Sequence, residues 1–151
     1  RWEKGYFVSD LVFGRWRYSE MKKKVENMWT LKRTDALVIE DKSSGQEIIQ
    51  DLQDESSLPV LPTDPDFSKL DKVARANLVQ PLFEAGKIYY HAGAEWSAEM
   101  EEECAAFPRG IHDDIVDAIV HGIRWLEMHD PRKQAAQEDA EESERGMEEG
   151  L

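Results

Sequence analysis

Hydrophobic positions along the chain fall into short runs typical of strands and longer runs with helical spacing. Residues 6–13 are rich in aromatic and β-branched side chains and predict a strand that Gly14 helps to end. In residues 19–33 the apolar side chains recur every three or four positions with lysines between them, which predicts an amphipathic helix. The next apolar run, residues 36–39, predicts a buried strand that ends on Glu40.

The same alternation continues to about residue 128. The elements expected there are a short helix around residues 48–52, a strand over 58–61, a loop over 63–69, a helix from 70 that Gly86 stops, a strand over 87–91, and helices over 96–107 and 112–128. Pro59 would confine its strand to a sheet edge or stand in the first turn of the strand, and Pro81 would kink its helix. Strands that alternate with helices predict an α/β domain, in which helices cover a sheet.

Length and composition place limits on this domain. A chain of 151 residues suits one domain, which we expect over residues 1–130, followed by an acidic, mobile tail over 131–151. No apolar run is long enough to cross a membrane and no secretory signal opens the chain, so a soluble cytoplasmic protein is expected. The single cysteine, Cys104, cannot form an internal disulfide and is expected to be a buried, inert thiol.

The net charge of -13 argues against nucleic acid as a partner, because phosphates are normally bound by Lys and Arg patches. Part of that charge lies in residues 131–151, which hold seven acidic and three basic residues. Clustered carboxylates are also what a divalent-metal site requires. The charge therefore fits a metal-dependent enzyme better than a passive DNA-binding module.

Two groups of acidic residues are candidates for chemistry. Glu40 stands at the carboxyl end of a buried strand, where open α/β sheets place ligands, although such an acid alone more often only meets solvent. In the last helix, Asp113, Asp114 and Asp117 fall within an arc of roughly 100°. Acids near a helix N-terminus are also favoured by capping and by the helix dipole. Each group taken alone is therefore better explained without a function.

Convergence of the two groups would change that assessment. If the helix that carries Asp117 packs beside the strand that ends at Glu40, their carboxylates could hold two Mg²⁺ or Mn²⁺ ions. Other kinds of site have less support. The four histidines form no recognised zinc pattern, His121 is expected on the solvated face of its helix, and no G-x-x-x-x-G-K-[ST] phosphate loop occurs.

Three segments together resemble one protein family, the nuclease domain of terminase large subunits from tailed phages and prophages. The matching segments are residues 5–16 (GYFVSDLVFGRW), a strand and arginine-containing turn; residues 39–45 (IEDKSSG), the second acidic motif; and residues 112–118 (HDDIVDA), the third, preceded by Phe107-Pro108. The intervening segments 71–76 (DKVARA) and 81–86 (PLFEAG) are also typical of the family. The resemblance spans about residues 5–126 in matching order and spacing.

The resemblance implies an RNase H-like mixed sheet flanked by helices. It also implies a two-metal endonuclease, using Mg²⁺ or Mn²⁺, that cuts concatemeric phage DNA during genome packaging. By position, Glu40 would bind or bridge metal, Asp117 would be the metal ligand on the C-terminal helix, and Asp114 would support the same site.

Three further residues receive roles from the same resemblance. Asp113 would be a ligand, a supporting group or only a helix cap, while Lys42 would steady the scissile phosphate and Arg75 would contact the DNA backbone. The implied partners are double-stranded DNA, the small terminase subunit and the portal, in the host cytoplasm. An ATPase domain would precede this one.

The chain departs from the family pattern at its start. The family's first catalytic aspartate lies on a strand earlier than the first strand predicted here, so we expect an N-terminally truncated domain that cuts DNA weakly or not at all. The main alternative is a non-catalytic packaging or interaction module, in which a partner chain completes an open sheet edge. A resolvase or transposase of the same fold class is a third interpretation.

Overall fold

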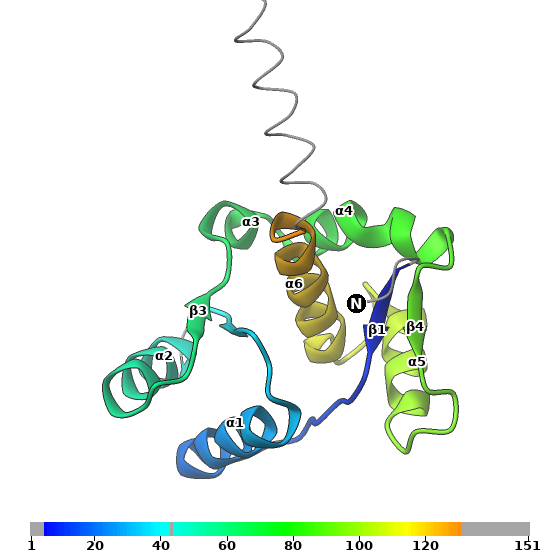
Figure 1. Cartoon of the computed structure of the whole chain (residues 1–151). Coiled ribbons are helices and arrows are strands. Elements are labelled where there is room, and N and C mark those ends of the chain that lie inside the picture. The colour runs from blue at the N-terminus through cyan, green and yellow to red at the C-terminus, as the bar shows by residue number, and fades with distance from the viewer. Residues whose placement is uncertain (1–4, 43, 131–151) are drawn as a thin grey trace, which may run out of the picture.

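The computed structural model describes residues 5–42 and 44–130 as a chain of short strands and helices (Figure 1). The elements are β1 (Tyr6–Val8), α1 (Tyr18–Lys32), β2 (Leu37–Ile39), α2 (Ser44–Glu55), β3 (Val60–Pro62), α3 (Pro65–Lys69), α4 (Lys72–Glu84), β4 (Ile88–Tyr90), α5 (Ser97–Ala106) and α6 (Asp114–Met128). The mixture of strands and helices agrees with the predicted α/β class. The predicted tail, residues 131–151, lies outside the described residues.

The strands form two separate sheets of two parallel strands each. β1 pairs with β4, with Tyr6 opposite Ile88, and β2 pairs with β3, with Leu37 opposite Val60. Within the described residues there is thus no single mixed sheet of the kind that the sequence led us to expect. Parallel strands need crossover connections, and α2 supplies the one between β2 and β3.

The first predicted strand is shorter than expected, for a local reason. It ends at Val8, five residues before the predicted end. The carboxylate of Asp10 accepts a hydrogen bond from the backbone N–H of Leu11 at 2.9 Å and pairs with Lys32 at 2.9 Å. Side chain to backbone bonds of this kind compete with the sheet ladder. The strand therefore gives way to an irregular segment that leads to α1.

The segment predicted as a loop over residues 63–69 contains a short helix, α3. Asp64 caps it, because its carboxylate accepts a hydrogen bond from the N–H of Asp66 at 3.0 Å, and Pro65 occupies the first turn. Asp71 caps α4 in the same way, through the N–H groups of Val73 and Ala74. A helix of five residues is too short to produce a recognisable hydrophobic period.

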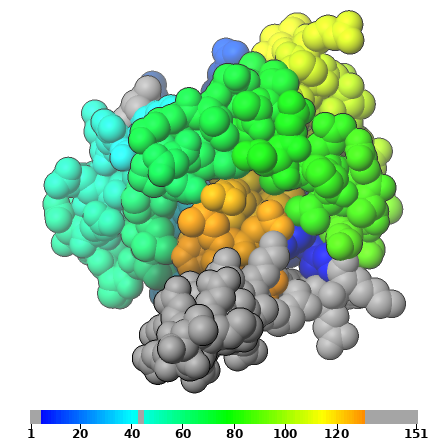
Figure 2. Space-filling model, turned by 90° about the horizontal axis from the view of Figure 1, so that it is seen from above, coloured from blue at the N-terminus to red at the C-terminus, as the bar shows by residue number. Residues whose placement is uncertain are grey.

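Helix α6 lies between the two sheets and is the centre of the larger of two hydrophobic cores (Figure 1). The buried members of the larger core are Tyr6, Phe67, Val79, Met100, Ile115, Val116, Ile119, Val120 and Ile123. The smaller core consists of Ile48, Leu52 and Val60, with α1 packed against it through partly buried side chains. Seen from above, α3 and α4 lie beside the end of α6 (Figure 2). The two cores define a large half and a small half of the molecule.

Two expectations about individual features can be compared with the structure. Cys104 is partly buried against the larger core, and burial raises the pKa of its thiol, which keeps the less reactive protonated form at neutral pH. Among the described residues, none of the helices has both the length and the apolar character that crossing a membrane requires.

Candidate functional site

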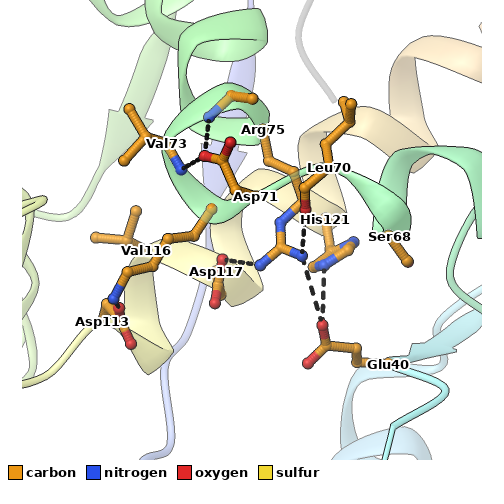
Figure 3. A network of polar contacts seen from close by, with 12 residues as sticks. Glu40, Ser68, Leu70, Asp71, Val73, Arg75, Asp113, Val116, Asp117 and His121 are labelled. Atoms are coloured by element: carbon orange, nitrogen blue, oxygen red, sulfur yellow. Dashed lines mark hydrogen bonds and ion pairs between the residues drawn. The ribbon is translucent and has the colours of Figure 1, made fainter.

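The candidate site lies where the two halves of the molecule meet. Glu40 follows β2 of the small half, whereas Arg75 stands near the start of α4 and Asp117 and His121 lie one turn apart on α6 (Figure 3). The side chains of these four residues point toward one another. Helix α6 contacts β2 directly, which brings the end of that strand to the acidic side of the helix.

Arg75 connects the two acids that the sequence singled out. One guanidinium nitrogen, Nη2, donates to Asp117 Oδ1 at 2.8 Å, and the other, Nη1, lies 3.8 Å from Glu40 Oε1 (Figure 3). The Arg75 side chain is only 5 % exposed. The guanidinium is buried between carboxylates, and the DNA-backbone contact assigned to Arg75 from the sequence stays a prediction.

His121 is buried, and its expected place on a solvated helix face is wrong. Its ring packs edge-on against Phe67 with centroids 5.3 Å apart, and its Nε2 lies 3.6 Å from Glu40 Oε1 without a hydrogen-bond partner among the described residues. Burial and the nearby Arg75 charge lower the pKa of His121, which favours the neutral ring.

The carboxylate of Glu40 has a second cationic neighbour. Lys42 donates to Glu40 Oε1 at 2.9 Å from the exposed side of the site. Burial raises the pKa of Glu40, but the Lys42 hydrogen bond and the charges of Lys42 and Arg75 outweigh burial and leave that pKa below its usual value. Glu40 is therefore ionised at neutral pH.

The acids at the start of α6 have different surroundings. Asp113 stands at the N-cap position but makes no capping bond, because its carboxylate pairs with Lys72. Glu103 of α5 caps the helix instead, accepting from the N–H groups of Ile115 at 2.6 Å and Val116 at 3.0 Å. Asp114 is exposed.

Comparison with known protein families gives a match over most of the chain. The model of the family described as "Terminase RNaseH-like domain" matches residues 2–124. The chain belongs to this family. Comparisons with curated proteins and with solved structures found no match. The family confirms the resemblance to the terminase nuclease domain and indicates a nuclease-type module of phage DNA packaging.

In this terminase RNaseH-like domain, the donor atoms suit a divalent metal but do not form a complete site. Glu40 and Asp117 come from separate elements and already share one cation, the guanidinium of Arg75. Carboxylate oxygens are the ligands that Mg²⁺ and Mn²⁺ prefer. Across residues 5–42 and 44–130, however, no three histidine, cysteine or acidic side chains are placed to hold a metal ion. The pair fits a metal as two of its ligands.

The sequence did not reveal the positions of two residues at the terminase domain's site. His121 was expected on a solvated face, and Glu103 was not singled out. His121 follows Asp117 by four positions, and residues four apart lie on the same helix face. That spacing was the available signal for His121. The capping role of Glu103 had no comparable signal, because it depends on how α5 packs against α6.

Proposed function

We propose that this terminase domain is a metal-dependent DNA endonuclease that cuts concatemeric viral DNA during genome packaging. The observation that carries the proposal is the meeting of Glu40 and Asp117 on one cation, in a chain that belongs to the terminase RNaseH-like family. Two acids that are far apart in sequence and share a cation are a suitable start for a metal centre.

Glu40 and Asp117 are the residues that would hold Mg²⁺ or Mn²⁺, with Asp114 and Asp113 nearby at the start of α6. The chemistry that these metals supply in nucleases is activation of a water molecule and stabilisation of the leaving oxygen. Lys42 is 51 % exposed beside Glu40, so its ammonium group could pair with the scissile phosphate.

The distribution of charge supports DNA as the substrate better than the net charge does. Residues 15–33, the segment that contains α1, carry seven basic and only two acidic residues. Arg15, Arg17, Lys23, Lys24 and Arg33 of this segment are exposed. A basic segment within an acidic chain is the arrangement expected where a protein contacts the phosphate backbone away from its metal ligands.

The packaging partners are part of the same proposal. The small terminase subunit and the portal would bring the domain to DNA in the host cytoplasm, and an ATPase domain of the same protein would drive translocation. These partners are inferred from the family alone.

The experiment is Mn²⁺-dependent cleavage of supercoiled plasmid, followed by the conversion of supercoiled to nicked and linear DNA. We expect slow cleavage that Glu40→Gln and Asp117→Asn abolish. Asp66→Asn is the matched control, because Asp66 is an exposed acid that pairs with Lys69 on the surface of α3. Cleavage that survives both site substitutions would overturn the assignment of the acids.

The same assay tests the expected weakness of this chain. A longer protein that includes the family's preceding strands should cut faster if the first catalytic aspartate lies there. If neither protein cuts DNA with Mn²⁺, the proposed endonuclease function fails.

The sheet arrangement favours a second candidate, an interaction module that a partner chain completes. Each described sheet has only two strands, and exposed apolar side chains lie on or near them, among them Val12, Phe13 and Leu61. Unpaired strand edges are sites at which another chain can add a strand. Analytical ultracentrifugation of the chain would show concentration-dependent association if this candidate is right, and a monomer at all concentrations if it is wrong.

A further inference from the structure

The proposed function leaves one feature of the site unexplained, which is the arginine between the two candidate metal ligands. The geometry points to Arg75 as a resident counter-cation that holds Glu40 and Asp117 together when no divalent metal is bound, and that must withdraw from them for metal to bind (Figure 3). This inference rests on the proposed function, because it concerns the same two carboxylates.

Three acids of the site, Glu40, Asp113 and Asp117, are already paired with cations of the chain. The ion pairs are Arg75–Asp117, Arg75–Glu40, Lys42–Glu40 and Lys72–Asp113. A divalent cation that entered between Glu40 and Asp117 would meet the positive charge of Arg75 at close range, and such repulsion is strong in a partly buried site. Metal and guanidinium therefore compete for the same carboxylates.

Of the three basic residues, Arg75 is the one that controls this competition. Lys42 and Lys72 are 51 % and 46 % exposed, so their flexible side chains can turn into solvent when a metal binds. The Arg75 side chain is 5 % exposed and cannot leave the carboxylates without a local rearrangement at the start of α4. Its withdrawal is therefore the step that limits metal affinity.

The contacts around Arg75 also leave polar groups unsatisfied. Arg75 Nε and His121 Nε2 are buried without hydrogen-bond partners among the described residues, and the Arg75–Glu40 separation of 3.8 Å is too long for a hydrogen bond. Buried polar atoms without partners are unfavourable. The guanidinium thus holds the two acids without satisfying the whole site, which leaves room for a ligand that binds them better.

The test is Mn²⁺ binding to the whole chain, measured by the electron paramagnetic resonance signal of free Mn²⁺. Arg75→Gln should bind Mn²⁺ at least about tenfold more tightly than the wild type, since it removes a unit charge roughly 4 Å from the acids. Arg75→Lys, which keeps the charge, should stay closer to the wild type. The gain should disappear when Asp117→Asn is added. Unchanged or weaker Mn²⁺ binding by Arg75→Gln would overturn the inference.

Arg124→Gln is the matched control. Arg124 is a partly buried arginine that, like Arg75, pairs with an aspartate, Asp64 at 3.2 Å, but it does not contact the two acids. If Arg75 had only a structural role, Arg75→Gln and Arg124→Gln would both be less stable than the wild type. Neither variant would then bind Mn²⁺ more tightly.

A measurement on the wild type covers the case in which Arg75→Gln does not fold. Saturating Mg²⁺ should shift the NMR signal of the Arg75 Nε–H, and a signal that stays unchanged while Mg²⁺ binds would also overturn the inference. Failure here is distinct from failure of the proposed function, because cleavage that depends on Glu40 and Asp117 would persist even if Arg75 does not compete with metal.

Discussion

Helices α1 and α6 each contain 15 residues, yet they are held in place by different forces. α6 buries six side chains, most of them in the larger core, whereas α1 has no buried residue. α1 is instead attached by partly buried apolar contacts and by polar contacts such as Lys22–Glu55 at 2.5 Å and Tyr18–Asp51 at 2.6 Å. Exposed ion pairs contribute little to stability. The large half is thus stabilised by burial, and the small half by a few apolar contacts and a polar surface.

The largest expected effect tests whether the two cores unfold together. Ile123→Ala in the large core and Leu52→Ala in the small core should each cost about 2–5 kcal/mol of unfolding free energy, because both side chains are buried. Hydrogen exchange should then show faster exchange in α2, β2 and β3 for Leu52→Ala, with α6 still protected.

Leu31→Ala is the control for Leu52→Ala, because Leu31 is 79 % exposed. It should leave both stability and exchange nearly unchanged. If Leu52→Ala and Ile123→Ala accelerate exchange equally throughout the chain, the two halves form one cooperative unit and the comparison fails.

A smaller effect is expected where α5 supports α6. Glu103→Gln replaces the carboxylate that accepts from the N–H groups of Ile115 and Val116, and should cost about 1 kcal/mol in urea unfolding. Glu102→Gln, at the exposed neighbouring position, should have little effect. Equal stability of the two variants would mean that the negative charge of Glu103 does not contribute to the capping of α6.

The stability of the large half at acidic pH depends on Asp64. Burial raises the pKa of Asp64, but hydrogen bonds from the N–H groups of Phe67 and Asp66 and from Arg124 outweigh burial, and the net pKa is lowered. Because the pKa of Asp64 in the folded state is lower than its ordinary value of 3.8, the ionised carboxylate stabilises the fold above about that pH. That stabilisation is lost as the pH falls through the folded-state pKa.

Asp64→Asn should therefore lower the unfolding free energy by about 0.5–1 kcal/mol at pH 7. The difference should shrink toward pH 3, as measured by urea unfolding at several pH values. A difference that stays constant over this range would contradict the role of the ionised carboxylate.

The smallest effect concerns the polar attachment of α1. The hydrogen bond from the Tyr18 hydroxyl to Asp51, together with burial, raises the pKa of Tyr18 to about 12. Asp51→Asn should bring the Tyr18 pKa down toward the usual 10.0, as measured by ultraviolet titration against a Tyr18→Phe reference. An unchanged titration would show that the two side chains are not in contact in solution.

The sequence predicted most helices and strands because their signals are local. The apolar spacing of residues 112–128 corresponds to α6, and the short apolar run at 36–39 corresponds to β2. The sheet arrangement could not be predicted, since β1 pairs with β4 across some eighty residues of chain, and no local pattern reports such a partner.

Much the same division applies to the candidate site. Glu40 and Asp117 were singled out because a strand end and a helix face are visible in a sequence, and their catalytic roles stay predictions. The position of Arg75 was not visible, because a basic residue on a helix gives the same pattern whether it faces solvent or a carboxylate from another element. His121 was misplaced because its burial depends on Phe67 of α3, a helix that the sequence did not reveal.

The order of the elements has a mechanical consequence for the site. The chain leaves the large half after β1, builds the small half from α1 to β3, and returns at α3, so the small half is an insertion joined by two covalent crossings. Glu40 belongs to the insertion and Asp117 to the large half, and α6 contacts β2 directly. The distance between the two acids is therefore set by how the insertion packs against α6, and not by either core alone.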